Sequence, residues 1–235
     1  MLGIAIGVAV LIIVMSVVNG FERELKDRIL AMSAHATIEG MQGMSDEWPA
    51  WIETAKTDPM VLGAAPYVSG QALLVYGQKL SGAALQGIDP DSERQVSGVA
   101  GRMVQGSLDG LEPGKFGIVL GIDLAEVLKL SVGDKVTATL AQGIVTPAGV
   151  VPRTKRFTVT GIYRAGMFEF DRRLAFINIQ DAQRLYRMGN KVTGVRLAVT
   201  DIYRAPQIVR QVAVAAGGGV QYRIDPGHGC EGQAV

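Results

Sequence analysis

The longest apolar run of the chain covers residues 2–18 and contains a single polar side chain, Ser16. As an α-helix, a run of this length rises about 25 Å, slightly less than the roughly 30 Å of a bilayer's hydrocarbon core. The pattern predicts a transmembrane helix over residues 1–20 that is incomplete at its N-terminus. A buried helix of a soluble protein and a cleaved signal peptide are the alternatives, and the run lacks the basic segment that precedes a signal peptide's apolar region.

A charged segment at residues 21–34 continues the helical periodicity as a stalk. Glu22 stands four residues before Lys26. Glu24 stands in the same relation to Arg28, and each acid-first pair stabilises a helix by a few tenths of a kcal/mol. One face of the stalk carries its apolar residues: Phe21, Leu25, Ile29 and Met32. This face predicts contact with the chain's own domain or a neighbouring membrane helix, and a solvated helix with an ordinary core-facing stripe is the alternative.

Short alternating segments separated by glycine and proline follow the stalk and predict an α+β domain. Residues 35–97 are predicted to run strand, helix, strand, strand, with Ser45 as the N-cap of a helix at residues 48–56. Gly77-Gln78 predicts the turn of a hairpin between the last two strands.

Residues 98–190 are predicted to form a second, mostly β subdomain with two small helices, entered through a glycine-rich connection at residues 98–113. Residues 191–224 return to strand, helix and strand, the same type of unit as the opening segment. We therefore predict one split α+β subdomain, residues 35–97 with 191–224, into which the β-rich subdomain is inserted. The polar, glycine-rich tail at residues 225–235 is predicted to be disordered or foreign to the fold.

The composition argues against several classes of function. The 23 Lys and Arg nearly balance 22 Asp and Glu, whereas nucleic-acid binding relies on clustered basic residues. The single cysteine, Cys230, excludes an internal disulfide. His35 and His228 have no orienting group beside them in the sequence, and no GxxxxGK[ST] phosphate loop is present. We expect no metal site and no cofactor in this chain.

Glu169 and Asp171 are the candidate carboxylates of a membrane-anchored enzyme. On a strand, positions i and i+2 share a face, where two carboxylates can bind a cation or perform acid–base catalysis. Arg172 and Arg173 follow directly, so a salt-bridge network at a turn is the stronger interpretation.

The segment at residues 143–153 interrupts the predicted sheet. Pro147 and Pro152 cannot donate ladder hydrogen bonds, so the segment is predicted to leave the sheet as a stiffened loop with an apolar tip. Apolar loops rimmed by charge often mark contacts with a partner, and a tip packed on its own domain is the alternative. The candidate loop comprises Thr146, Pro147, Ala148, Gly149, Val150, Val151, Pro152 and Arg153, with Lys155 and Arg156 at its base.

Three stretches together resemble the permease subunits of the lipoprotein-releasing ABC transporter (LolC/LolE type). That family's first membrane helix and stalk resemble LGIAIGVAVLIIVMSVVNGFERELKDRIL. Its recurring strand–helix–strand segment resembles GIVLGIDLAEVLKLSVGDKV, and the region of its chaperone-catching loop resembles TPAGVVPRTKRFTVTGIYRAGMFEFDRRLAFINIQDAQRL. The likeness covers residues 2–224. Permeases of the macrolide-efflux and cell-division types, which transmit mechanical motion, share this layout and are the alternative; the cell-division type would recruit a cell-wall hydrolase instead of a carrier.

The resemblance implies a subunit of the bacterial inner membrane with its globular part in the periplasm. That part would be a porter-like split α+β subdomain with an inserted β-rich subdomain. The expected partners are an ATPase subunit that binds ATP and Mg, a second permease subunit, a periplasmic lipoprotein carrier and the lipoprotein substrate. Since the family has three further membrane helices, we expect the chain to be a truncated or frame-shifted fragment.

The resemblance also implies roles for individual residues. The loop from Thr146 to Arg153 would bind the carrier, while Lys155 and Arg156 would meet acidic groups at the carrier's rim. Acyl chains of the substrate would contact one part of the membrane helix, at Val14, Met15, Val17, Val18 and Phe21. Ordinary contact with membrane lipid is the alternative for these five residues.

Overall fold

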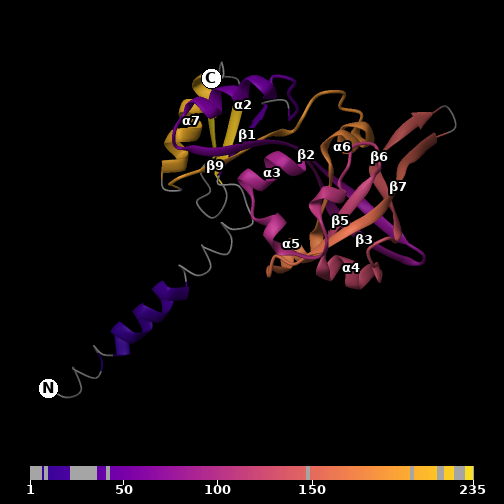
Figure 1. The fold of residues 1–235 in the computed structure, drawn as a ribbon, viewed down its shortest axis with the longest axis horizontal. Helices are drawn as coiled ribbons and strands as arrows, with labels where there is room; N and C mark the ends of the chain where they lie inside the picture. The colour runs from indigo at the N-terminus through magenta and orange to yellow at the C-terminus, as the bar shows by residue number, and fades with distance from the viewer. Residues whose placement is uncertain are drawn as a thin grey trace.

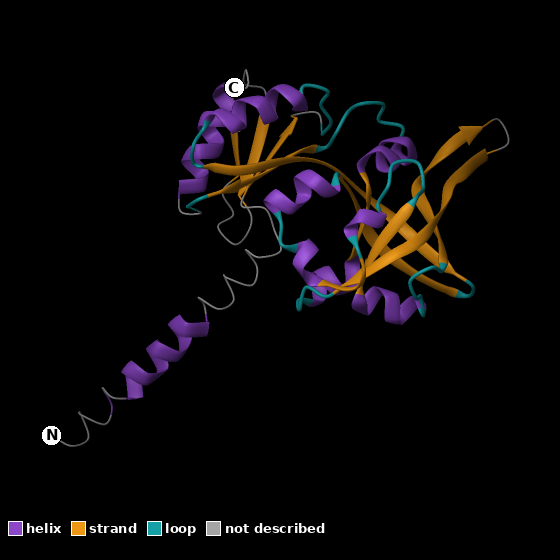
Figure 2. Cartoon of the chain, in the orientation of Figure 1, coloured by secondary structure: helices purple, strands orange, loops and turns teal. Residues whose placement is uncertain are grey.

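The structure is a computed structural model that describes residues 7, 10–21, 36–40, 43–146, 149–201, 204–215, 220–224 and 231–234. Its strands, orange in Figure 2, are β1 (Ala36–Gly40), β2 (Val61–Tyr76), β3 (Lys79–Ile88), β4 (Met103–Gly106), β5 (Gly117–Gly121), β6 (Lys135–Thr146), β7 (Gly149–Tyr163), β8 (Leu174–Asn178), β9 (Gly194–Val199), β10 (Val220–Ile224) and β11 (Glu231–Ala234). Its helices are α2 (Trp48–Thr57), α3 (Pro90–Val96), α4 (Ile122–Leu128), α5 (Phe168–Arg173), α6 (Ile179–Tyr186) and α7 (Ala205–Ala215), with 3-10 turns η1 (Val99–Arg102) and η2 (Leu108–Gly110).

The named strands join one sheet in the order β11-β10-β1-β9-β2-β3-β8-β5-β7-β4, and β6 pairs with both β2 and β7. Figure 1 shows that this sheet belongs to two lobes. One lobe carries α2 and α7, the other carries α4, α5 and α6, and α3 lies between them. This α+β architecture agrees with the fold class predicted from the sequence.

The terminal lobe combines residues 36–67 with residues 194–224. β1 pairs antiparallel with both β9 and β10, so segments from the two ends of the chain share one sheet. One face of this sheet packs against α2 and α7, whose apolar stripes supply buried residues such as Trp51 and Val209. The sequence predicted that these two halves pair, and the strand registers show the pairing.

The central lobe contains most of the remaining strands, within residues 68–192. Its main core is lined by Leu74, Leu85 and Phe157, all fully buried. The hairpin between β2 and β3 turns at Gly77, whose φ of 58° favours glycine. A second core lies on another face of the sheet, around Tyr163 and Phe176.

Strand β2 belongs to both lobes, and it corrects the predicted boundary. Its first part pairs with β9 up to Tyr67, and its second part pairs with β3 from Tyr67 onward. Val68 and Leu85 therefore lie in the core of the central lobe, although residues 35–97 were predicted to belong to the split subdomain. The strand crosses between the lobes without a break, so no linker marks the boundary in the sequence.

Three local expectations also differ from the structure. The order predicted for residues 35–97, strand, helix, strand, strand, lacks helix α3, whose first turn is capped by the Asp89 carboxylate, which accepts a hydrogen bond from Ser92 N at 3.1 Å. The N-cap of α2 is Glu47, while Ser45 Oγ accepts from Glu47 N at 3.1 Å. Within the predicted disordered tail, β11 pairs antiparallel with β10.

The N-terminal segment is described in part. Residues 10–21 are helical and their side chains are exposed. Within the described ranges, no helix is both long enough and apolar enough to cross a bilayer. The predicted stalk beyond residue 21 lies outside the described residues, as do His35 and His228.

Candidate functional site

The segment predicted as a carrier-binding loop is the outer part of a hairpin arm, formed by residues 141–152 and projecting from the central lobe (Figure 1). Val151 pairs with Ile144, and Gly149 pairs with Thr146. The expectation that residues 143–153 leave the sheet is therefore wrong. Pro152 falls at the register shift between the Leu140 and Ile144 pairs, where a missing N–H removes no regular ladder bond.

The arm is described through its backbone. Pro147 and Ala148 lie outside the described residues, and the side chains of residues 141–151 are likewise outside the description. The exposed apolar tip predicted for Val150 and Val151 therefore stays a prediction. The strand registers alone place Val150 opposite Val145 and Val151 opposite Ile144, which concentrates four β-branched residues at the end of the arm.

Two of the three basic residues at the base of the arm contact other groups of the central lobe, and the third does not within the described residues. Arg153 is half-buried, and its Nη1 donates to the carbonyl oxygen of Leu185 at 3.4 Å. The Lys155 ammonium lies 3.7 Å from the centroid of the Phe116 ring, a cation–π contact. Arg156 lies on the face of β7 opposite to that of Arg153 and Lys155. It is exposed and forms no ion pair within the described part of the chain.

The residues predicted to contact acyl chains lie on the helix at residues 10–21. Their exposed fractions run from 46% at Val18 to 65% at Val17 and Phe21, and Val14 and Met15 lie between these values. These side chains have no packing partner from the described part of the globular lobes. The helix thus presents apolar surface that is free to contact lipid, an acyl chain or another helix.

The two candidate catalytic carboxylates are not paired. Glu169 and Asp171 lie on helix α5, where positions i and i+2 do not face each other. Asp171 is buried and accepts hydrogen bonds from Ala165 N at 2.6 Å and Gly166 N at 2.9 Å. Glu169 is exposed and lies 3.7 Å from Arg173. The enzyme hypothesis loses its site, because the Asp171 carboxylate is buried and bonded to two backbone amides, whereas the Glu169 carboxylate is exposed and opposed by Arg173.

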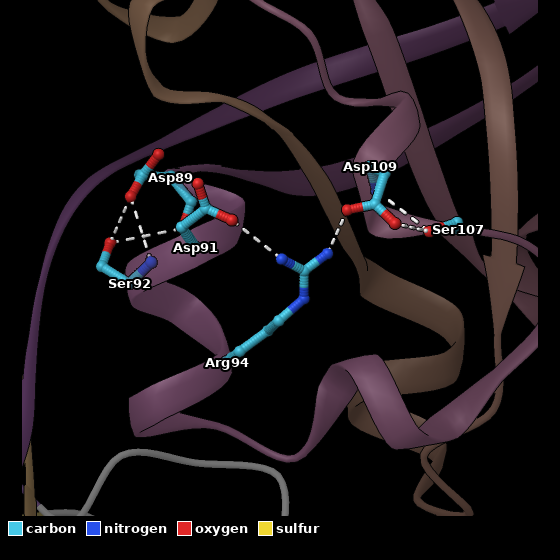
Figure 3. Close-up of polar contacts among 6 residues, drawn as sticks. All are labelled: Asp89, Asp91, Ser92, Arg94, Ser107 and Asp109. Atoms are coloured by element: carbon cyan, nitrogen blue, oxygen red, sulfur yellow. Dashed lines mark hydrogen bonds and ion pairs between the residues drawn. The ribbon is translucent and has the colours of Figure 1, made fainter.

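Helix α3 is fastened to the central lobe by an exposed polar network (Figure 3). Arg94 bridges Asp91 on its own helix, at 2.9 Å, and Asp109 on η2. Ser107 Oγ donates to Asp109 at 2.7 Å. The Ser107 hydroxyl and then the Arg94 guanidinium hold the pKa of Asp109 below its usual value. This network sets where α3 lies relative to the central lobe.

The opposite side of α3 is fastened to the terminal lobe by a buried ion pair. Glu93 Oε2 lies 2.5 Å from Arg196 Nη2 on β9, and the two side chains are 0% and 9% exposed. Arg196 also donates to Gln86 Oε1 at 3.2 Å and lies over the Tyr67 ring, 5.2 Å from its centroid. Tyr67 donates to Glu39 at 2.6 Å, and burial, followed by this bond, raises the pKa of Tyr67 well above its usual value.

Sequence reasoning missed this network. The signal was a single arginine in the apolar strand GVRLAV, where a charge is costly unless a buried partner meets it. Glu93 could be identified as the partner of this arginine only once α3 was known to be a helix with one face buried. Arg94 therefore fastens α3 to the central lobe and Glu93 fastens it to the terminal lobe; we call these two contacts the α3 bracket.

Comparison with known proteins gives consistent relatives. The family model of the MacB-like periplasmic core domain matches residues 1–215. Two relatives carry the name "Lipoprotein-releasing system transmembrane protein LolC": one from Xylella fastidiosa, 44% identical over 92% of this chain and 52% of its own length, and one from Neisseria meningitidis serogroup B, 43% identical over 88% of this chain and 50% of its own length. The chain thus spans about half the length of the curated relatives it matches.

A solved structure supports the fold. The periplasmic region of MacB from Actinobacillus actinomycetemcomitans superposes with a TM-score of 0.53 at 14% identity, covering 83% of this chain and 91% of that one. At this identity the likeness concerns the α+β fold alone.

Proposed function

Since the chain belongs to the family of the MacB-like periplasmic core domain, we propose that it serves as a permease subunit of a lipoprotein-releasing ABC transporter. The subunit extracts acylated lipoproteins from the inner membrane and hands them to a periplasmic carrier. The observation that carries this proposal is the name shared by relatives 43% and 44% identical to this chain, "Lipoprotein-releasing system transmembrane protein LolC".

In this proposal the chain itself is not an enzyme. An ATPase subunit in the cytoplasm binds ATP and Mg and supplies the energy, and a second permease subunit completes the membrane part. The lobes lie in the periplasm, on the outer side of the bacterial inner membrane. The bracket around α3 supports this arrangement, because a motion of the terminal lobe reaches the central lobe through polar contacts on both sides of one helix.

The arm is the proposed contact with the carrier. A two-stranded arm loses little conformational entropy on docking, because the ladder already fixes its backbone. Val150 and Val151 enter the mouth of an acyl-binding groove, and Arg156 speeds the encounter with acidic groups at the rim. Arg153 and Lys155 contribute mainly by holding the base of the arm, since their cations are engaged within the lobe.

The test replaces Val150 and Val151 by Thr, which keeps the β-branched shape and removes apolar surface. Carrier capture by the purified full chain is expected to fall at least about tenfold, or about 1.4 kcal/mol. Thr is preferable to deleting residues 146–153, because a deletion also removes Arg153, whose pairing partner Leu140 lies in the core.

The matched control makes the same change at Val104 and Val132, which are exposed at 51% and 42% on other parts of the lobe. Capture by the control is expected to equal that of the unchanged chain, with both variants folded by circular dichroism. If the arm variant also retains full capture, the arm plays no part in carrier binding. The macrolide-efflux and cell-division alternative is not favoured, because the relatives at 43% and 44% identity carry the lipoprotein-releasing name.

A further inference from the structure

A cleft outside the arm and the α3 bracket lies between β3 and α5, with a volume of about 800 Å³. These elements are neighbours in Figure 1. Its floor is formed by the small residues Gly82 and Ala84 together with Gln71, and its wall by Phe168 and Arg172. The volume falls within the range of about 300–1,000 Å³ that is typical of ligand sites.

The wall of this cleft is preformed. Asp171 holds the turn before α5 through Ala165 N and Gly166 N. The buried Tyr163 hydroxyl shares its one proton between the carbonyl oxygens of Phe170, at 2.9 Å, and Leu174, at 3.2 Å, and so holds the end of α5. A ligand therefore meets a surface whose shape requires little reorganisation.

The open space above the floor is shown by Gly82. A Cβ added there meets no atom within 4 Å, and the position lies in a regular antiparallel pair with Leu73. One edge of β3 is paired along its length by β2, whereas β8 pairs with the other edge only from Ala84 to Ile88. The side chains that line the cleft supply its chemistry.

The cleft offers cationic, amide and aromatic groups together with one carboxylate, that of Glu169. Arg172 makes one long hydrogen bond, from Nη1 to Ser81 Oγ at 3.4 Å, and its other N–H groups have no partner in the described part of the chain. The cation of Arg173 is already opposed by Glu169. The Gln71 amide is exposed, and the Phe168 ring is 64% exposed.

We propose that this cleft binds an acidic peptide segment of a partner protein. The Arg172 guanidinium pairs with a carboxylate of that segment, for which its planar fork is suited. The glutamine amide bonds the segment's backbone, and Phe168 covers an apolar side chain. An acyl chain is disfavoured because it would desolvate arginine and glutamine without bonding them. This inference does not depend on lipoprotein release or on the arm.

The test measures fluorescence anisotropy with the full chain in detergent micelles. One labelled eight-residue peptide has glutamates around a central phenylalanine, and its partner has glutamine at each glutamate. The glutamate peptide is expected to bind at least tenfold tighter, and its affinity is expected to fall with added salt.

Two variants probe the cleft in different ways. Arg172→Gln removes the cation, and Gly82→Val fills the open floor at a strand position that suits a β-branched residue. Each is expected to weaken the glutamate peptide at least tenfold. Arg210→Gln, at an exposed position on α7, removes the same charge elsewhere and is expected to leave binding unchanged.

Equal affinity for the two peptides, failure of the glutamate peptide to bind the unchanged chain, or full binding by both cleft variants overturns the proposal. Thermal melting of each variant, compared with the unchanged chain, separates lost binding from lost folding, and Gly82→Val is not expected to unfold the protein.

Discussion

Breaking the buried ion pair between Glu93 and Arg196 is expected to uncouple the two lobes. The perturbation is Arg196→Met, which keeps much of the side-chain length and leaves the Glu93 carboxylate without its cation. The pair is shielded from water, with the Glu93 side chain wholly buried and that of Arg196 9% exposed. Solvent therefore screens it far less than the Arg94 pair on the other side of the same helix.

The expected magnitude follows from burial. Two unit charges about 4 Å apart attract by about 4 kcal/mol at an effective dielectric constant of about 20. Forming the pair costs desolvation, so its net worth is smaller, but removing one partner strands the other charge and costs about 3–5 kcal/mol. Glu93 Oε1 and Arg196 Nε lack hydrogen-bond partners in the described residues, which favours the lower end of that range. Replacing both residues by Met leaves no stranded charge and is expected to change the free energy of unfolding far less, because exchanging a buried ion pair for apolar side chains is often neutral.

The assay is urea unfolding of the full chain, followed by two probes. Both tryptophans of the chain lie on α2, but Trp48 also packs against the core of the central lobe. In a Trp48→Phe background, the fluorescence of the buried Trp51 reports the terminal lobe. Far-ultraviolet circular dichroism reports both lobes. The transitions are expected to coincide in the unchanged chain and to separate in Arg196→Met, with the fluorescence change at lower urea.

Arg94→Met is the control, since it removes another cation from the same helix. The Arg94 side chain is 37% exposed, so the loss of unfolding free energy is expected to be much smaller. The reasoning is refuted if Arg196→Met lowers the free energy of unfolding by less than about 1 kcal/mol, or if the effects of the Glu93 and Arg196 changes simply add in the double variant.

Three further outcomes are expected. Met15→Asp in a full-length background should block lipoprotein binding without preventing membrane insertion; crosslinkers at Met15 that never capture lipoprotein would contradict this. Burial raises the pKa of Tyr186 to about 12, so its contribution to stability is complete below pH about 10 and lost as the pH rises through about 12, which ultraviolet titration and alkaline unfolding measure. Gly121→Ala should lower the free energy of unfolding by at least about 1 kcal/mol, because its Cβ would lie 2.3 Å from the Asp171 carbonyl oxygen, whereas Gly82→Ala should not; equal melting temperatures would contradict this.

The local elements of the terminal lobe were accessible from the sequence. The sequence predicted strand, helix and strand over residues 191–224, and the structure has β9, α7 and β10 there in that order. These segments follow their own periodicity because each buries one face against the lobe. The short helix α3 was missed although Asp89 and Pro90 are a capping residue and a favoured first helical residue.

The arm and the bracket depended on information that local patterns do not contain. Two prolines were interpreted as ending the sheet at residue 143, but the register shift accommodates Pro152 within β7. Glu93 and Arg196 are 103 positions apart, so no spacing rule links them. The cleft escaped detection for the same reason, because its floor and wall come from β3 and α5 and meet only in the folded chain.

Strand β2 runs without a break through both lobes. Its 16 residues, at about 3.3 Å each, span about 50 Å. β2 pairs with β9 near its first end and with β6 at Leu73–Val75 near its other end. If the terminal lobe rotates and β2 keeps its shape, the arm moves with it by a distance that grows with the length of β2.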